Sequence, residues 1–221
     1  MSTLVKKFSI TVLVSVIFGY LLLMQTGCTL SNNEEINDSN AKNKKYNNSY
    51  FEITYPNLIT LKENDNAILL THSVSYEHID PCDFKGEEQP LQTLTDFKVK
   101  LELVNNNFEA TLKLNESDNF ISEYLIGNKL KATPDFINEV SINTLKGYRI
   151  TYGVEGCGVY TYYFPLDADH TLVAIRSFIA EFNTITANHD KYINLPGVIK
   201  PDEDEKIFNE IMASFKLIRV N

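Results

Sequence analysis

The chain has 221 residues, of which 20 are Lys or Arg and 29 are Asp or Glu, giving a formal net charge of −9. An acidic surface repels phosphate backbones and anionic bilayers, which argues against nucleic-acid binding and against a polybasic membrane patch. The length suits one ordinary globular domain with an N-terminal extension.

The first 27 residues are typical of a bacterial export signal. Lys6 and Lys7 supply positive charge, and Phe8 to Met24 is a run of 17 residues without a charge. At about 1.5 Å per residue, a helix of that length spans about 26 Å, less than the roughly 30 Å hydrocarbon core of a bilayer. This favours a signal peptide, residues 1–27, over a permanent transmembrane helix.

The signal ends in the sequence Met24-Gln25-Thr26-Gly27-Cys28, which resembles a bacterial lipobox. The resemblance implies cleavage before Cys28 and lipidation of its sulfur. Two or three acyl chains hold a soluble domain at a membrane stably, since each buried methylene contributes roughly 0.8 kcal/mol. We therefore expect a lipoprotein of the bacterial cell envelope, anchored to a membrane and facing the periplasm or the exterior. An uncleaved signal-anchor is the alternative.

Residues 28–49 are predicted to be a disordered tether. The stretch 29–49 has seven asparagines and no aromatic residue before Tyr46, so it has almost nothing to bury. An ordered arm is the alternative. Removal of residues 1–27 leaves 18 basic and 29 acidic residues, a net charge of −11. The folded domain is then expected over residues 50–221.

Alternation of apolar and polar residues predicts strands in the first half of the domain. The segment 96–104 places four apolar residues on one face, as in an antiparallel sheet with one wet side, although a helical period also fits it. We predict a strand to 104 and a helix from about 106, with Asn105 as its N-cap. The polar stretch 80–89 is predicted to be a loop. The predicted strands here are 50–55, 58–61, 67–74 and 96–104.

Four more strands separated by short turns are predicted near 137–144, 147–153, 158–165 and 171–182, which indicates an antiparallel meander. From Pro201 the pattern becomes helical, with four acids at the start and then an apolar stripe. A last short strand is expected within 217–220. The predicted fold class is α+β, a central antiparallel β-sheet flanked by helices.

Three segments carry a resemblance to a known fold family. They are YFEITYP (50–56), GYRITYGVEGCGVYTYYFPL (147–166) and EKIFNEIMASFKLI (205–218). Their order resembles the PsbP/Mog1-like fold, in which an amphipathic helix near the end runs into a final strand. The resemblance implies binding to a partner protein without a shared catalytic residue, and no site residue is carried over from it.

With Cys28 assigned to lipid, Cys82 and Cys157 remain. In an oxidising compartment an even pair of cysteines usually forms a disulfide. The closed loop would hold 76 residues, and the chain-entropy estimate for that length is about 4 kcal/mol. Both cysteines lie beside turn-forming residues, so we predict a Cys82–Cys157 disulfide.

Two catalytic alternatives use the same cysteines. His72, His78 and Cys82 fit zinc-ligand spacing loosely. A Cys157 nucleophile with His170 as its base is the second. Either would make the chain an envelope enzyme, such as a hydrolase. No nucleotide, metalloprotease or serine-hydrolase motif is present in the sequence, so no cofactor is expected.

Four tyrosines in the region of the meander are candidates for a binding surface: Tyr148, Tyr152, Tyr160 and Tyr162. Cross-strand aromatic pairing in the core is the alternative. An exposed tyrosine platform could bind a peptide, a sugar or another protein. The sequence thus favours a non-catalytic binding or scaffolding module for an envelope protein or a small ligand, with a small-ligand carrier as a further option.

Overall fold

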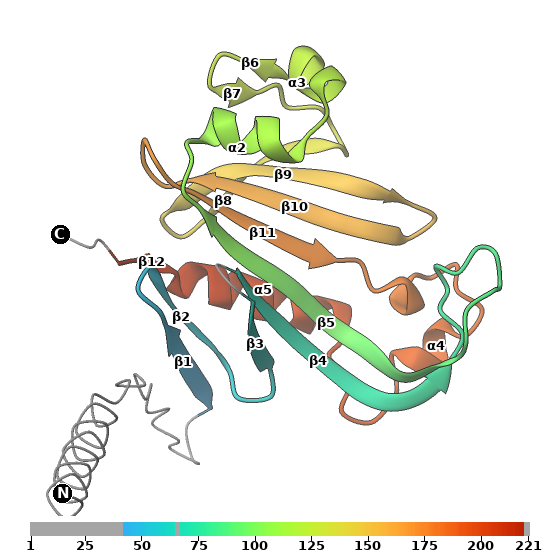
Figure 1. The fold of residues 1–221 in the computed structure, drawn as a ribbon. Helices are drawn as coiled ribbons and strands as arrows, with labels where there is room; N and C mark the ends of the chain where they lie inside the picture. The colour runs from blue at the N-terminus through green and yellow to red at the C-terminus, as the bar shows by residue number, and fades with distance from the viewer. Residues whose placement is uncertain (1–41, 65–66, 219–221) are drawn as a thin grey trace, which may run out of the picture. The chain divides into compact units, whose positions relative to one another are not determined.

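The computed structural model describes residues 42–64 and 67–218 (Figure 1). The expected signal peptide, Cys28 and the tether up to residue 41 lie outside the described residues. In the part that is described, none of the helices combines the length and apolar character of a membrane span.

A seven-stranded antiparallel sheet forms the centre of the domain, with the strand order β3-β4-β5-β11-β10-β9-β8. This confirms the predicted α+β class with a central antiparallel sheet. The meander is also confirmed, since β8 to β11 are consecutive neighbours. The strands are β3 (Thr60–Asn64), β4 (Ala67–His78), β5 (Leu91–Val104), β8 (Ile137–Ile142), β9 (Leu145–Val154), β10 (Cys157–Pro165) and β11 (Thr171–Ser177).

A second, three-stranded sheet contains β1 (Asn43–Asn47), β2 (Phe51–Pro56) and β12 (Lys216–Leu217), in the order β1-β2-β12. The tether prediction is therefore wrong for β1, which is an ordered edge strand. Backbone hydrogen bonds to β2 and the packing of Tyr46 on Phe51, with ring centroids 5.8 Å apart, hold this polar segment in place. The predicted last strand is present as β12.

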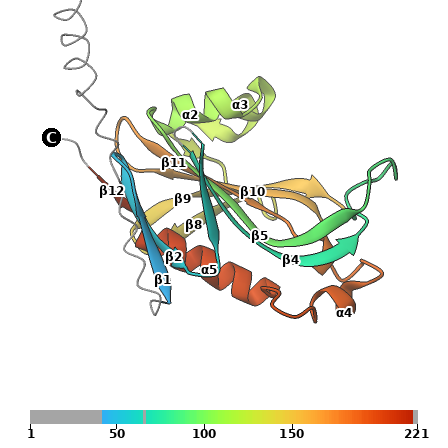
Figure 2. The ribbon, with the colours of Figure 1, turned by 60° about the horizontal axis from the view of Figure 1, so that its bottom comes forward.

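Helix α5 (Pro201–Ser214) covers one face of the domain together with β2, as Figure 2 shows. Its predicted apolar stripe is buried and belongs to the largest hydrophobic core. Apolar side chains of β2 and of the α5-facing side of the large sheet also belong to that core. The stripe comprises Ile207, Phe208, Ile211, Met212 and Phe215.

Helices α2 (Phe108–Asn115) and α3 (Asp118–Tyr124) lie over the opposite face, above β9 and β10 in Figure 1. The predicted helix starts two residues later than expected. Its N-cap is Asn107 rather than Asn105, because the Asn107 side chain accepts the Ala110 N–H at 2.9 Å. Helix α3 and the small hairpin of β6 (Leu125–Ile126) and β7 (Lys129–Leu130) were not predicted.

The predicted loop 80–89 is confirmed and joins β4 to β5 at the end of the sheet where a short 3₁₀ helix, η1 (Ala180–Phe182), and α4 (His189–Tyr192) also lie (Figure 1). The predicted strand 171–182 was too long, since β11 ends at Ser177. The side chains of Leu94, Phe182 and Tyr192 form a third, smaller core at this end.

Candidate functional site

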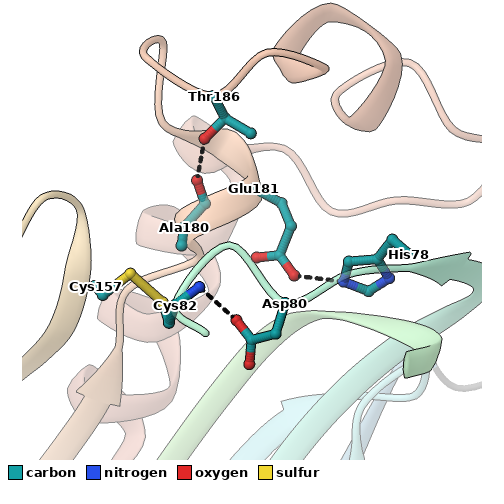
Figure 3. Close-up of a disulfide and its surroundings, with 7 residues drawn as sticks. All are labelled: His78, Asp80, Cys82, Cys157, Ala180, Glu181 and Thr186. Carbon is teal, nitrogen blue, oxygen red and sulfur yellow. Dashed lines mark hydrogen bonds and ion pairs between the residues drawn. A yellow bond between two sulfur atoms is a disulfide. The ribbon is translucent and has the colours of Figure 1, made fainter. Parts of the chain in front are cut away.

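A disulfide between Cys82 and Cys157 joins the β4–β5 loop to the first residue of β10, with the two Cα atoms 5.7 Å apart (Figure 3). The predicted pairing is therefore confirmed. The loop is positioned for it by Asp80, whose carboxylate accepts the Cys82 N–H at 2.7 Å. The Cys157 sulfur is bonded to Cys82 and is not a free thiolate, so the alternative of a Cys157–His170 catalytic pair is not formed.

The histidines of the alternative sites are held by carboxylates. The His72 Nδ1 lies 2.7 Å from the Asp96 Oδ1, the His78 Nε2 lies 2.7 Å from the Glu181 Oε1, and the His170 Nδ1 lies 2.9 Å from the Asp167 Oδ1. Within residues 42–64 and 67–218, no three His, Cys, Asp or Glu side chains gather as metal ligands would. The alternative metal site at His72, His78 and Cys82 is not assembled, because His72 and His78 each pair with a carboxylate and Cys82 is in the disulfide.

The predicted tyrosine surface divides between the two faces of the sheet. Tyr148 is buried under α2, where its ring stacks on Phe108 with centroids 5.4 Å apart, whereas Tyr162 is buried under α5. Tyr152 packs with the α2 side, and Tyr160 lies on the α5 side. The four rings therefore do not form one platform, because strand alternation separates the two pairs.

Tyr152 also belongs to a polar network under α2. Its hydroxyl and that of Tyr163 both donate to the carboxylate of Glu116, at 2.6 Å from Tyr163. Burial raises the pKa of both tyrosines far above their usual value, and the adjacent carboxylate raises it further. This network joins the end of α2 to β9 and β10.

The α5 side of the sheet carries a pocket with a volume of about 380 Å³. It lies between β9, β10 and β11, the segment that follows β11, and the start of α5. It is lined by Arg149, Gly156, Tyr160, Arg176, Ser177, Phe178, Ile179, Phe182, Asn183, Pro201, Asp204 and Glu205. This volume falls within the usual range for small-ligand sites, about 300–1,000 Å³.

Strand register brings the two arginines to this pocket. Arg149 on β9 stands opposite Tyr162, and Arg176 on β11 stands opposite Tyr160. Residues directly opposite each other in an antiparallel pair share a face, so all four side chains face α5. The Arg149 guanidinium lies 4.9 Å from the centre of the Tyr160 ring and the Arg176 guanidinium 6.0 Å from it.

Arg176 is neutralised by a carboxylate of α5. Its Nε donates to the Asp204 Oδ2 at 3.1 Å, its Nη2 donates to the same oxygen, and both side chains are only 10% exposed. Burial lowers the pKa of Arg176, but the Asp204 carboxylate more than reverses this and leaves it above the usual value. Asp204, one of the four acids predicted at the start of the last helix, thus forms its main contact as an ion pair with Arg176 of the sheet.

Arg149 has no such partner among the described residues. Its Nη2 donates to the Asn138 Oδ1 at 3.1 Å, no carboxylate pairs with it, and its Nε is buried without a hydrogen-bond acceptor. Burial raises the pKa of the nearby Tyr162 hydroxyl, while both guanidinium groups act on it in the opposite direction. The two cations therefore converge on one wall, and only one of them is paired.

Sequence reasoning did not identify the two arginines. One signal was available, since the chain has three arginines against 17 lysines and two of the three fall in neighbouring parts of the meander. Arg is preferred to Lys where a charge is partly buried and hydrogen-bonded in a fixed plane. Which face they share depends on the register, which the sequence pattern alone did not define.

No protein-family model matches the chain, and no curated protein matches it. Among solved structures, a crystal structure from Bacteroides thetaiotaomicron VPI-5482 is similar at 10% sequence identity and a TM-score of 0.41. The match covers 81% of this chain and 50% of the other, so the chain spans half the length of that structure.

Proposed function

We propose that this chain is a lipoprotein of the bacterial cell envelope, held at a membrane through acyl chains on Cys28, whose folded domain is a non-catalytic binding module. The Cys82–Cys157 disulfide carries the proposal. Structural disulfides form and persist in oxidising compartments outside the cytoplasm, which is where an exported lipoprotein resides. The disulfide thus agrees with the export signal that precedes Cys28.

The arrangement of the ionisable side chains supports binding rather than catalysis. A general acid or base must be able to exchange a proton with a substrate. His72, His78 and His170 each pair with a different carboxylate, on different elements of the domain, and within residues 42–64 and 67–218 these pairs do not gather into one cluster of His, Cys, Asp and Glu side chains. Asp96 is in addition fully buried and accepts the Ile199 N–H at 2.7 Å, so it holds two chain segments together.

The finer fold assignment, a PsbP/Mog1-like domain, belongs to the same proposal. It is supported by the amphipathic helix α5 that runs into the short strand β12, and by the pairing of β12 with β2. The better-known members of that family bind partner proteins, in agreement with a binding role.

The pocket of about 380 Å³ favours a small-ligand carrier as the second candidate function. A scaffold that only contacts another protein needs no concave site of this size, whereas a carrier does. Both candidates share the anchor, and they differ in whether the bound molecule occupies the pocket.

Mass spectrometry of the protein purified from native cells tests the anchor. We expect an N-terminal Cys28 that carries diacylglycerol, and we expect the Cys28→Ser variant to leave the membrane fraction. A Thr26→Ser variant is the matched control and should remain in that fraction. An intact Met1 terminus, or an unmodified sulfur on Cys28, would refute the proposal.

A further inference from the structure

We propose that the pocket between Arg149, Tyr160 and the start of α5 binds the carboxylate of a small ligand, with Arg149 as the residue that recognises it. The inference rests on the proposal that the domain is a binding module, but it is independent of the lipid anchor. It assigns the ligand class through the charges, the shape of the guanidinium and the apolar lining.

The charges of the pocket wall leave one cation to be satisfied. Arg176 is paired with Asp204 inside the pocket wall, whereas Arg149 donates to the amide oxygen of Asn138, lies over the face of the Tyr160 ring and acts on the Tyr162 hydroxyl, all uncharged groups. The Arg149 guanidinium therefore has hydrogen-bonding capacity that the domain does not use, since its buried Nε–H lacks an acceptor, which costs about 1–3 kcal/mol. A negatively charged ligand group would give Arg149 the anionic partner that Arg176 already has in Asp204.

The guanidinium geometry selects a carboxylate. A planar guanidinium presents parallel N–H groups that match the two oxygens of a carboxylate, and such charge-assisted pairs are roughly twice as strong as neutral hydrogen bonds. The side chain is already oriented by Asn138 on one edge and by Tyr160 on its face. Less conformational freedom is therefore lost on binding.

The acids at the rim disfavour a doubly charged ligand. Glu205 lines the pocket and is exposed, and it is followed inward by the paired carboxylate of Asp204. A phosphate dianion would gain attraction from Arg149 but would meet repulsion from these two carboxylates. A carboxylate carries half that charge, so the single cation of Arg149 neutralises it, whereas a dianion keeps one uncompensated negative charge beside these acids.

The remaining lining accommodates an apolar ligand body. Phe178 packs against the Tyr160 ring with centroids 4.4 Å apart, and Ile179 and Phe182 continue the same wall. An apolar wall beside a few placed polar groups, here Arg149, Arg176 and Asn183, is a usual arrangement in a small-molecule site. An aryl carboxylate such as phenylacetate matches both features.

Nuclear magnetic resonance of the full-length protein in detergent micelles tests the assignment through the arginine Nε–H signals, of which the sequence allows three. Phenylacetate is titrated, with phenylacetamide as the neutral analogue and phenyl phosphate as the dianion. We expect a saturable shift of the Arg149 signal, identified by its loss in Arg149→Lys. The Arg176 signal serves as a comparison, since its Nε–H already donates to Asp204.

Phenylacetamide and the Arg149→Lys variant should each show binding at least about tenfold weaker, the loss expected for a charge-assisted bidentate pair. Lys146→Gln removes an exposed charge from the same strand and should bind as the wild type does. An unmoved Arg149 signal, or equal affinity for the amide, overturns the inference, and tighter binding of phenyl phosphate overturns the ligand class. None of these results bears on lipidation of Cys28, which the mass measurement decides separately.

Discussion

Removal of one partner of the Arg176–Asp204 ion pair should destabilise the domain more than removal of both. Each side chain is only 10% exposed, so solvent screens the pair weakly. Arg176→Met leaves the Asp204 carboxylate buried without its cation, and Asp204→Leu leaves the guanidinium buried without its anion. Loss of one member of a buried pair costs about 3–5 kcal/mol, and we expect each single variant to fall in that range.

The double variant Arg176→Met/Asp204→Leu removes both charges and places apolar groups beside Phe208. In the wild type, the Arg176 guanidinium lies 5.4 Å from the centre of the Phe208 ring. We expect a coupling energy of at least about 2 kcal/mol in the double-mutant cycle, because replacement of a whole buried pair is often close to neutral. Urea unfolding of the full-length protein at pH 7, followed by circular dichroism, gives the four free energies.

A matched cycle on the same helix uses the exposed pair Lys206–Glu210, whose charged atoms lie 3.9 Å apart with side chains 74% and 59% exposed. Alanine at both positions should reveal a coupling of no more than about 0.5 kcal/mol. If the costs of Arg176→Met and Asp204→Leu are additive, the two charges are not mutually dependent and the reasoning on this pocket wall is refuted.

Three further changes have defined outcomes. Gly156→Ala should lower the free energy of unfolding in urea by at least about 2 kcal/mol, and Gly127→Ala by about 1 kcal/mol. Both glycines have positive φ, but only a Cβ at Gly156 would meet a neighbour, the Asn183 side chain, at 2.2 Å. Equal costs for the two variants would contradict this. The raised pKa of Tyr152 and Tyr163 favours their neutral form in the folded state, so this stabilisation is present below about pH 10 and is lost as the pH rises further. Thermal melts should show that the melting temperature falls above that pH, and that it falls less steeply in the Tyr152→Phe/Tyr163→Phe variant. An equally steep fall of melting temperature with pH in this variant would count against the network. Reduction of the disulfide should lower the free energy of unfolding by up to about 4 kcal/mol, the loop-entropy value for a sequence separation of 75, and superimposable urea curves with and without reductant would exclude it.

Strand β5 and helix α5 were predictable because the spacing of their own apolar residues matches the face that they bury. In β5 the apolar residues Phe97, Val99, Leu101 and Leu103 alternate with polar ones and all four are buried, and in α5 the buried residues recur at helical spacing. Strand β1 was not predictable on those grounds. Its residues are mostly polar, and it is ordered by pairing with β2, a tertiary interaction that its local sequence does not encode.

The N-cap of α2 shows a smaller limit. Three consecutive asparagines, residues 105–107, all satisfy the preference for a capping side chain. The structure selects Asn107, whose side chain reaches the Ala110 N–H while its carbonyl accepts the Thr111 N–H at 2.9 Å. The preceding residue, Asn106, uses its carbonyl to accept the hydroxyls of Thr111 and Thr171. The choice of capping residue for α2 thus depends in part on a contact between Asn106 and Thr171 of β11, which are far apart in the sequence.

The disulfide was predictable from the expected oxidising compartment and from the even number of cysteines left after Cys28, whereas the pocket beside it was not. Two cysteines in an oxidising compartment have few other partners, so the pairing needs no knowledge of the fold. The pocket needs the register of two strand pairs, because Arg149 and Arg176 converge only when each stands opposite a tyrosine of β10. A one-residue slip in either pairing would turn one arginine to the α2 side.

The disulfide and the pocket share a wall, which links the two proposals physically. Cys157 begins β10 directly after Gly156, and Gly156 lines the pocket against Asn183 from the segment that follows η1. The turn at Glu155 and Gly156 has positive φ at both residues, the geometry of a tight two-residue hairpin, so it cannot adjust freely around a ligand. The disulfide fixes the same turn to the β4–β5 loop from the other side. A compartment that maintains the bond therefore also maintains the shape of this wall, and a ligand site here is best formed in the environment to which an export signal would deliver the chain.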